Sequence, residues 1–351
     1  MPDSSKSLRV LVVRLGAMGD ILHSLPAITA LRRAHPGWHI GWAVEPQWTS
    51  LFRAENALPG TEGMPLVDTL HIVPAKRWAK APFSLQTLRE IRTIRRELRA
   101  AKYDVAIDLQ GAVRSAWIAR SAHPHNLIGE AEPREPLARL FFSKKVATRG
   151  VHVIEQSIEL TEALSSQTLP SLQPLLPCDT ASTAYAAALP QPLVLISPGA
   201  GWGAKRWPAS RYGEVAQNLT AQGYHVAINA GPSELDLAQQ ITAVCPSAMT
   251  LTPSLSELIA LTRRASLVIA GDTGPLHLAC ALGRPVVGIF GPTDPARNGP
   301  YGVPSRVLRH PESRRDHTRR TEPEAGLLTI APAAVTAAAM ELLTHPKEAS
   351  L

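Results

Sequence analysis

The stretch LRVLVVRLGAMGDILH, residues 8–23, decides the fold of the N-terminal half. Leu8–Val13 is an apolar, β-branched run that predicts a buried strand, and two glycines follow it in the loop of residues 15–20. Beyond that loop, apolar residues recur three or four positions apart, as on the buried side of a helix: Ile21, Leu25, Ile28 and Leu31. A strand that leads through a glycine loop into a helix is the repeating unit of a parallel α/β sheet.

The same alternation continues along the chain. Further strands are expected at His39–Val44, Asp68–Val73, Asp104–Asp108, Leu193–Ser197, His225–Asn229, Met249–Leu251, Leu267–Ala270 and Pro285–Phe290, and an arginine-rich helix at Leu88–Ala101. A proline-rich, weakly charged stretch from Ser165 to Pro192 is typical of a linker. We therefore expect two α/β domains, 1–170 and 192–328, joined by a linker of residues 171–191 and followed by a C-terminal helical segment, 329–351.

Composition narrows the class of protein. The 351 residues are 45% hydrophobic and 19% charged, which suits a globular chain rather than a disordered one. Three cysteines without a CxxC pair favour neither a disulfide framework nor a cysteine zinc site, and they suit a reducing, cytoplasmic compartment. The net charge of +7 favours an anionic partner, which leaves nucleic acid, an anionic membrane surface and a phosphorylated small molecule open.

In the N-terminal half, Asp20 and a basic stretch lie at strand ends. Asp20 begins a helix at the sheet edge where α/β proteins bind ligands, so it is either a functional carboxylate or a helix cap. Lys76, Arg77 and Lys80 follow a strand on the same edge and suit an anionic substrate. In the C-terminal half, the basic segment Arg306–Arg320 is expected to be a loop.

In the C-terminal half, three loops at strand ends suit a nucleotide. Pro198–Pro208 contains Gly199, Gly201 and Lys205, which form either a phosphate-binding loop or a plain tight turn. Glu234 follows the next strand and suits ribose hydroxyls, or caps a helix. In the third loop Asp272, Thr273 and Gly274 turn sharply into a helix that favours a diphosphate, and His277 lies one helical turn further along, facing the site or the core. No metal-ligand motif is present.

Five motifs, in this order and spacing, closely resemble the bacterial lipopolysaccharide heptosyltransferases: Arg14–His23, Asp108–Gly111, Lys205–Pro208, Gly271–His277 and Gly291–Pro295. The resemblance implies the GT-B architecture, two Rossmann-like domains facing each other across a cleft, with the C-terminal helix returning to the first domain. It implies an inverting transfer of L-glycero-D-manno-heptose from ADP-heptose to Kdo-lipid A, without a cofactor or obligatory metal. It also implies a cytoplasmic enzyme, at most peripheral on the inner membrane, with no nucleic-acid partner.

The resemblance also implies roles for single residues. Asp20 would be the general base, and the donor would be held by Gly199, Ala200, Gly201, Lys205, Glu234, Asp272, Thr273, Gly274 and His277. The acceptor would be held by Lys76, Arg77, Lys80, Gln110 and Arg134. Lys76–Lys80 and Arg134–Leu137 are most like heptosyltransferase I, whereas Pro198-Gly199-Ala200 is closer to heptosyltransferase II. A nucleotide-binding module and an NAD-dependent oxidoreductase are the remaining alternatives, although the first strand lacks the G-x-G-x-x-G loop of the latter.

Overall fold

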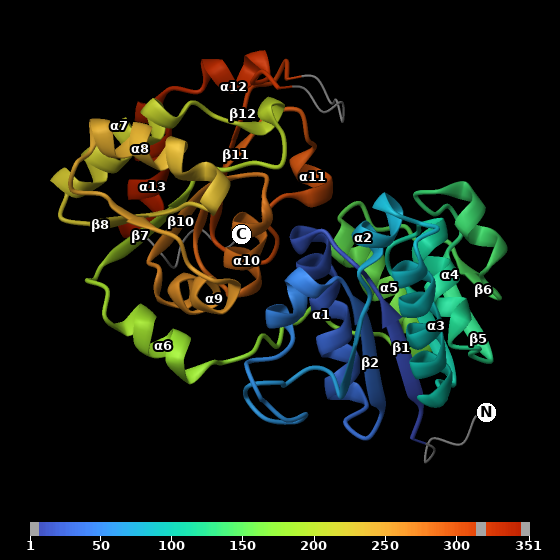
Figure 1. Ribbon diagram of the computed structural model, residues 1–351. Coiled ribbons are helices and arrows are strands. Elements are labelled where there is room, and N and C mark those ends of the chain that lie inside the picture. Colours follow the sequence, from blue (N-terminus) through green and yellow to red (C-terminus); the bar gives the residue numbers. More distant parts are fainter. Residues whose placement is uncertain (1–6, 314–320, 345–351) are drawn as a thin grey trace. The chain divides into compact units, whose positions relative to one another are not determined.

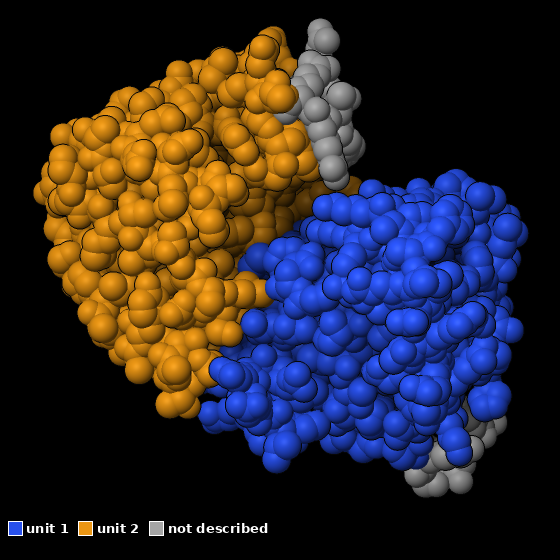
Figure 2. All heavy atoms as spheres, in the orientation of Figure 1, with its two compact units in different colours: residues 1–178 blue, residues 179–351 orange. Residues whose placement is uncertain are grey.

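A computed structural model describes residues 7–313 and 321–344, and the chain divides into two compact units, residues 1–178 and 179–351 (Figures 1 and 2). Each unit contains one six-stranded sheet in which every pair of neighbouring strands is parallel. The two strand orders are equivalent: β3-β2-β1-β4-β5-β6 in the first unit, and β9-β8-β7-β10-β11-β12 in the second. This is a doubly wound α/β order, and it confirms the parallel sheets that the sequence pattern predicts.

In the first unit, the strands in sheet order are β3 (Thr69–Ile72), β2 (His39–Val44), β1 (Arg9–Val13), β4 (Val105–Asp108), β5 (Asn126–Glu130) and β6 (Lys144–Val146). The helices are α1 (Met18–Ala34), α2 (Ala75–Lys80), α3 (Leu85–Ala100), α4 (Val113–Ser121) and α5 (Val153–Ser165), with short 3₁₀ turns η1 (Pro46–Leu51) and η2 (Pro136–Leu140). Leu11 and Val13 of β1 pack in one core with residues of α3 and α4. Helices α1 and α5 pack against each other.

In the second unit, the strands in sheet order are β9 (Met249–Leu251), β8 (His225–Asn229), β7 (Leu193–Ser197), β10 (Leu267–Gly271), β11 (Val286–Phe290) and β12 (Ser305–Arg309). The helices are α6 (Thr180–Ala187), α7 (Ala209–Ala221), α8 (Leu235–Val244), α9 (Leu255–Arg264), α10 (Gly274–Ala281), α11 (Pro295–Asn298), α12 (Ala325–Thr329) and α13 (Pro332–Thr344), with 3₁₀ turns η3 (Gly203–Lys205) and η4 (Pro232–Glu234).

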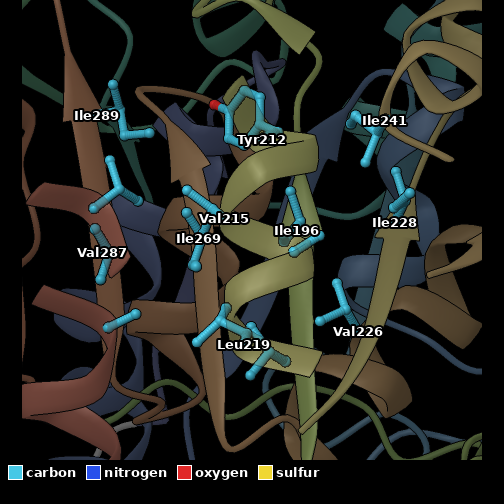
Figure 3. Close-up of a cluster of buried hydrophobic side chains, with 14 of the residues drawn as sticks. Ile196, Tyr212, Val215, Leu219, Val226, Ile228, Ile241, Ile269, Val287 and Ile289 are labelled. Atoms are coloured by element: carbon cyan, nitrogen blue, oxygen red, sulfur yellow. The ribbon is translucent and has the colours of Figure 1, made fainter. Parts of the chain in front are cut away.

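The second core shows why these segments fold as they do. Tyr212, Val215 and Leu219 lie three to four residues apart on α7 and point toward the sheet, where Ile196 and Ile269 face them (Figure 3). All of these side chains are buried. A helical stripe packed on β-branched strand residues removes both from water, which is the main favourable contribution to folding.

Two boundary predictions need correction. The C-terminal helix α13 was expected to return to the N-terminal domain, but it packs on α7 and on β10, β11 and β12, because Val335, Ala339 and Leu342 join the core of the second unit. The expected linker 171–191 is also not one connecting loop. Its first part is bound to the first unit, since Cys178 donates its N–H to the Glu62 carbonyl at 2.9 Å, whereas α6 packs against α9 of the second unit.

Other segments also differ from expectation. Strands β5, β6 and β12 were not predicted, and β12 occupies the beginning of the expected loop 306–320, of which residues 314–320 lie outside the described part. The basic stretch after β3, for which the sequence predicted no element, forms a short helix, α2.

Within residues 7–313 and 321–344, no helix is both long enough and apolar enough to span a membrane.

Candidate functional site

Asp20, the third residue of α1, lies in the turn that follows β1. Its Oδ2 accepts the Ala17 N–H at 3.1 Å, a bond of the helix-capping kind, and its Oδ1 is 3.1 Å from Arg14 Nη2. The side chain nevertheless keeps 43% of its surface exposed. Both sequence interpretations are therefore compatible with the geometry, since the carboxylate braces the turn and is open to a bound hydroxyl.

Arg14 and Leu15 tie together the loops that follow three neighbouring strands. The Arg14 guanidinium, besides pairing with Asp20, donates to the Leu109 carbonyl beyond β4. The Leu15 N–H donates to Gln110 Oε1 at 2.9 Å, and the Leu15 carbonyl accepts the Glu45 N–H at 3.1 Å. Sequence reasoning did not single out Arg14, although its position directly after a buried strand was a usable signal.

Gln110 and Arg134, two predicted acceptor residues, lie on loops that dock onto each other. Gly111 has φ +64°, and a Cβ there would come within 3.0 Å of the Arg134 backbone nitrogen, so the close approach of the two loops requires glycine. The Glu135 N–H donates to the Gly111 carbonyl at 2.8 Å. Arg134 is exposed beside Gln110, whose amide oxygen is already bonded to Leu15.

Asp108, the last residue of β4, is a buried carboxylate beneath these loops. It accepts the N–H groups of Gln110 and Gly111 at 2.9 and 3.2 Å and the Ser115 hydroxyl at 2.9 Å. Burial raises the pKa of Asp108 to about 6, although these hydrogen bonds oppose the shift. Asp108 thus shapes the loop that presents Gln110.

The predicted basic group lies on α2. The Lys76 N–H donates to Oε1 of the buried Glu45 at 2.8 Å, which fixes the start of the helix against the end of β2. Lys76 and Lys80 point to solvent, whereas Arg77 forms an ion pair with Glu90 at 2.6 Å. Of the three predicted acceptor residues on this helix, Arg77 is therefore already engaged in a local ion pair.

In the second unit, Lys205, Asp272 and His277 form a buried cluster. The Lys205 ammonium bonds to Asp272 Oδ2 and also lies 3.3 Å from the Asp272 carbonyl oxygen, and His277 Nε2 is 3.1 Å from Asp272 Oδ1. Only 6% of the Asp272 side chain is exposed. Burial alone would raise the pKa of Asp272, but the hydrogen bond and charge of His277 and the charge of Lys205 hold it well below its usual range.

Trp202, which sequence reasoning did not single out, lies beside this cluster. Lys205 Nζ is 4.4 Å from the centre of the Trp202 ring, within the range of a cation–π contact. The ammonium is therefore held by a carboxylate and an aromatic face before any ligand binds. Trp202 belongs to the loop that was predicted to bind phosphate, so its place in the sequence was the available signal.

Glu234 and the glycine loop meet at the same edge of the second sheet. A Cβ on Gly199 would come within 1.9 Å of Glu234 Oε1, so a larger residue here would displace this carboxylate from its present position against the loop. Glu234 Oε2 also accepts the Gly231 N–H at 3.0 Å, as the capping alternative predicts. At Gly201 a Cβ would meet no described atom within 4 Å, and Ala200 is buried.

Thr273 and Gly274 begin helix α10 at the end of β10. The Thr273 hydroxyl donates back to the Gly271 carbonyl at 3.2 Å, and no side chain caps the helix. The Gly274 N–H is thus left for an anion, since Pro275 has no N–H and the Leu276 N–H bonds to the Thr273 carbonyl at 3.1 Å. Among the residues that the structure describes, no group of three or more His, Cys, Asp or Glu residues is arranged to hold a metal ion.

Comparisons with known proteins match both units. A family model described as glycosyltransferase family 9 (heptosyltransferase) matches residues 91–327. Lipopolysaccharide heptosyltransferase 1 of Pseudomonas aeruginosa is 32% identical over 302 residues, 84% of this chain and 82% of the relative. The enzyme of the same name from Escherichia coli K12 is 32% identical over 327 residues, covering 87% and 94%.

A search of solved structures agrees. The structure of E. coli heptosyltransferase WaaC with ADP superposes with a TM-score of 0.79 at 29% identity, covering 95% of this chain and 99% of that one. E. coli heptosyltransferase II, at 22% identity and a TM-score of 0.77, shares the fold. The expected GT-B class, with two parallel-sheet α/β domains, is confirmed. The chain belongs to glycosyltransferase family 9, the heptosyltransferases.

Proposed function

We propose that this glycosyltransferase transfers L-glycero-D-manno-heptose from ADP-heptose to the Kdo of lipid A, as heptosyltransferase I. Relatives named heptosyltransferase 1 from three organisms are 31–32% identical to this chain, whereas a relative named heptosyltransferase 2 is 26% identical. A related structure carries ADP-2-deoxy-2-fluoro heptose, which supports an ADP-sugar as the donor. The reaction takes place in the cytoplasm, at the inner face of the membrane that holds the acceptor.

The observation that most supports this proposal is the division of chemistry between the two units. The first unit offers an accessible carboxylate, Asp20, at its sheet edge. The second offers a positive side chain, Lys205, in a glycine loop beside the uncapped start of α10. A sugar transfer from a nucleotide diphosphate needs both, a base for the attacking hydroxyl and positive charge for the leaving diphosphate.

In the proposed reaction the oxygen of a Kdo hydroxyl attacks the anomeric carbon of heptose, and Asp20 takes the proton of that hydroxyl. The bond from that carbon to the β-phosphate oxygen breaks through an oxocarbenium-like transition state, and the configuration inverts. Negative charge that develops on ADP is stabilised by Lys205 and by the N–H groups of Thr273 and Gly274. The residues named here need no metal for any of these steps.

The remaining predicted residues bind and orient the two substrates. Glu234 accepts hydrogen bonds from the ribose, Gly199, Ala200 and Gly201 allow the diphosphate to approach, and Asp272 accepts from heptose hydroxyls. His277 supports the donor site through its contact with Asp272. On the acceptor side, Lys76, Lys80 and Arg134 supply positive charge for Kdo carboxylates and lipid A phosphates, with Gln110 and Arg77 beside them.

Mass spectrometry of the products tests the proposal. Purified protein is incubated with ADP-heptose and either Kdo-lipid A or the same acceptor already carrying one heptose. We expect one heptose to be added to the first acceptor and none to the second. Addition to the second acceptor alone would instead identify a heptosyltransferase II, and addition to neither would contradict the proposal.

A further inference from the structure

The segment between α2 and α3 exposes large apolar side chains to solvent. Phe83 is 89% exposed, the largest value for any large hydrophobic side chain in the described part of the chain, and Leu85 is 73% exposed. Leu88, one turn further along α3, is also exposed. Exposing these rings and chains costs free energy, and a cluster of this kind marks a surface that is covered by a partner.

The two acidic side chains of α3 bond to neighbouring elements, although Glu97 keeps 44% of its side chain exposed. Glu90 bonds to Arg77 and, at 2.9 Å, to the indole N–H of Trp78, and Glu97 bonds to the buried His71. These contacts commit both carboxylates to neighbouring elements of the same unit. The remaining charged side chains of α3 are all arginines.

Three arginines of α3 face outward, whereas Arg95 packs over the Trp117 ring. Arg89, Arg92 and Arg96 are exposed, and none of them forms an ion pair with any residue that the structure describes. With Leu85 and Leu88 they recur three to four residues apart, so one stripe of the helix begins with leucines and continues with arginines. The surface formed by Phe83, Leu85, Leu88, Arg89, Arg92 and Arg96 is called the α3 surface below.

We propose that the α3 surface docks this protein on an anionic lipid membrane. Phe83 and Leu85 enter the boundary between headgroups and acyl chains, and Arg89, Arg92 and Arg96 pair with lipid phosphates. An apolar tip on a uniformly cationic stripe fits a surface that is itself uniformly anionic and has an apolar layer beneath. A protein partner would need an acidic patch around an apolar pocket of matching shape, whereas an anionic bilayer supplies both features over its whole surface.

The α3 surface follows the lysines of α2 that are proposed to bind the acceptor. The catalytic part of this inference therefore rests on the proposed function. Lys76 and Lys80, the exposed lysines of α2, directly precede Phe83 in the chain. An acceptor whose acyl chains stay in the bilayer presents its phosphates at the same depth at which Phe83 would insert. Docking through the α3 surface would therefore keep α2 beside the headgroup layer.

Vesicle co-sedimentation tests docking without any reference to catalysis. Wild-type protein is compared on phosphatidylcholine vesicles with and without phosphatidylglycerol, and we expect strong binding only where the anionic lipid is present. Phe83→Ser with Leu85→Ser should weaken binding about tenfold or more, since burial of such side chains is lost. Arg89→Gln, Arg92→Gln and Arg96→Gln should each cost about fivefold, and that loss should shrink as salt is added.

Leu58→Ser is the matched control. Leu58 is also in the first unit and is 69% exposed, but the exposed acidic residues Glu55 and Glu62 flank it. We expect this variant to bind vesicles like the wild type. Equal losses in the control and in the Phe83→Ser, Leu85→Ser variant, or no vesicle binding by the wild type, would overturn the proposal.

Two further measurements separate the alternatives. Rates with a de-acylated, soluble acceptor should be unchanged in the Phe83→Ser, Leu85→Ser variant, whereas rates with acceptor embedded in vesicles should fall. If no transfer occurs with any acceptor, the proposed function fails while vesicle binding still decides docking. If wild-type protein instead forms a dimer that the variant loses, the α3 surface binds a second copy and the membrane proposal is wrong.

Discussion

Asp108 and Asp272 occupy equivalent places in the two units and differ in their surroundings. Strand β4 pairs with β1, and β10 pairs with β7. Asp108 and Asp272 lie at the carboxyl ends of β4 and β10, and both are almost fully buried. Asp108 accepts only neutral hydrogen bonds, and no ion pair with it is found in residues 7–313 and 321–344. Asp272 is bonded to Lys205 and to His277.

The difference shows that the partners of a buried carboxyl decide its charge. Burial raises the pKa of Asp108 to about 6, whereas Lys205 and His277 hold the pKa of Asp272 well below its usual range. The second unit thus keeps buried positive and negative charge together at the proposed diphosphate site. The first unit has its accessible negative charge on Asp20 instead, and its buried carboxyl supports a loop.

Replacement of Asp20 tests the catalytic half of this comparison and should have the largest effect. Asp20→Asn can still accept the Ala17 N–H but cannot take a proton, so we expect turnover to fall by roughly two to four orders of magnitude. ADP affinity should stay near that of the wild type, because the proposed donor residues belong to the second unit. Product assays and calorimetric titration with ADP measure the two quantities.

Asp20→Ala is the companion variant, because it also removes the bond to Ala17 and the ion pair with Arg14. We expect it to melt at a lower temperature than Asp20→Asn while losing a similar amount of activity. Near-normal turnover in Asp20→Asn, with only a lower melting temperature in Asp20→Ala, would show that Asp20 is simply a helix-capping residue.

Asp108→Asn should remove a pH dependence of stability. The folded pKa of Asp108 is raised, so its contribution to stability is fully present below its unfolded pKa of about 4 and is lost as pH rises through about 6. Across that window we expect the variant to gain about 3 kcal/mol in unfolding free energy relative to the wild type, from a shift of about two pKa units. Urea unfolding at several pH values measures the difference.

The Asn side chain suits this position, because it can still accept from Gln110 and Gly111 and can donate to Ser115, whose hydroxyl also donates to the Ala112 carbonyl. A difference between variant and wild type that stays constant from pH 4 to pH 7 would mean that Asp108 does not carry the shifted pKa. The pH dependence of stability that Asp272 contributes has the opposite sign. Its folded pKa is lowered, so its contribution is present above its unfolded pKa and is lost as pH falls.

Much of the fold and part of the site could be predicted from the sequence. Strands β2, β7 and β8 contain apolar, partly β-branched runs and match their predicted bounds, as does the short edge strand β9, whereas β6 contains two lysines in three residues and offers no such pattern. Asp20 and Lys205 stood out because glycines precede them. Arg14 and Trp202 did not, because their roles come from contacts that residue type and spacing alone do not specify.

Lys205→Ala tests the buried charge pair in the second unit. It removes a charge-assisted bond to phosphate, so ADP binding should weaken by about 1.5–3 kcal/mol in a calorimetric titration. It also leaves Asp272 with His277 as its remaining ionic partner among the described residues, so the melting temperature should fall. Arg206→Ala, an exposed neighbour in the same loop, is the control and should change neither quantity much.

Glu234→Gln tests the ribose contact with a smaller change. One carboxylate oxygen and the charge are lost, while the amide oxygen can still accept the Gly231 N–H. We expect ADP to bind about tenfold more weakly, at the lower end of the range for hydrogen bonds to charged groups. Unchanged affinity both here and in Lys205→Ala would contradict a nucleotide site in the second unit.

Substitutions of the exposed charged residues on α2 should have the smallest effects, because exposed charges are screened and solvated. Lys76→Gln with Lys80→Gln should raise the acceptor KM several-fold and leave ADP affinity unchanged. Arg77→Gln should do less, since its guanidinium is already paired with Glu90. Rates with a de-acylated, soluble acceptor remove the contribution of the membrane.

The salt dependence of the acceptor KM shows whether the charges of α2 bind the acceptor or only face solvent. Exposed charges interact over about 10 Å at 0.1 M salt, so the wild-type acceptor KM should rise with ionic strength. The double variant Lys76→Gln, Lys80→Gln should show a flatter dependence, whereas Arg77→Gln should keep most of the wild-type slope. If all three proteins respond to salt alike, α2 does not bind the acceptor, and the charge that does must be sought at Arg134, on the loop that docks beside Gln110.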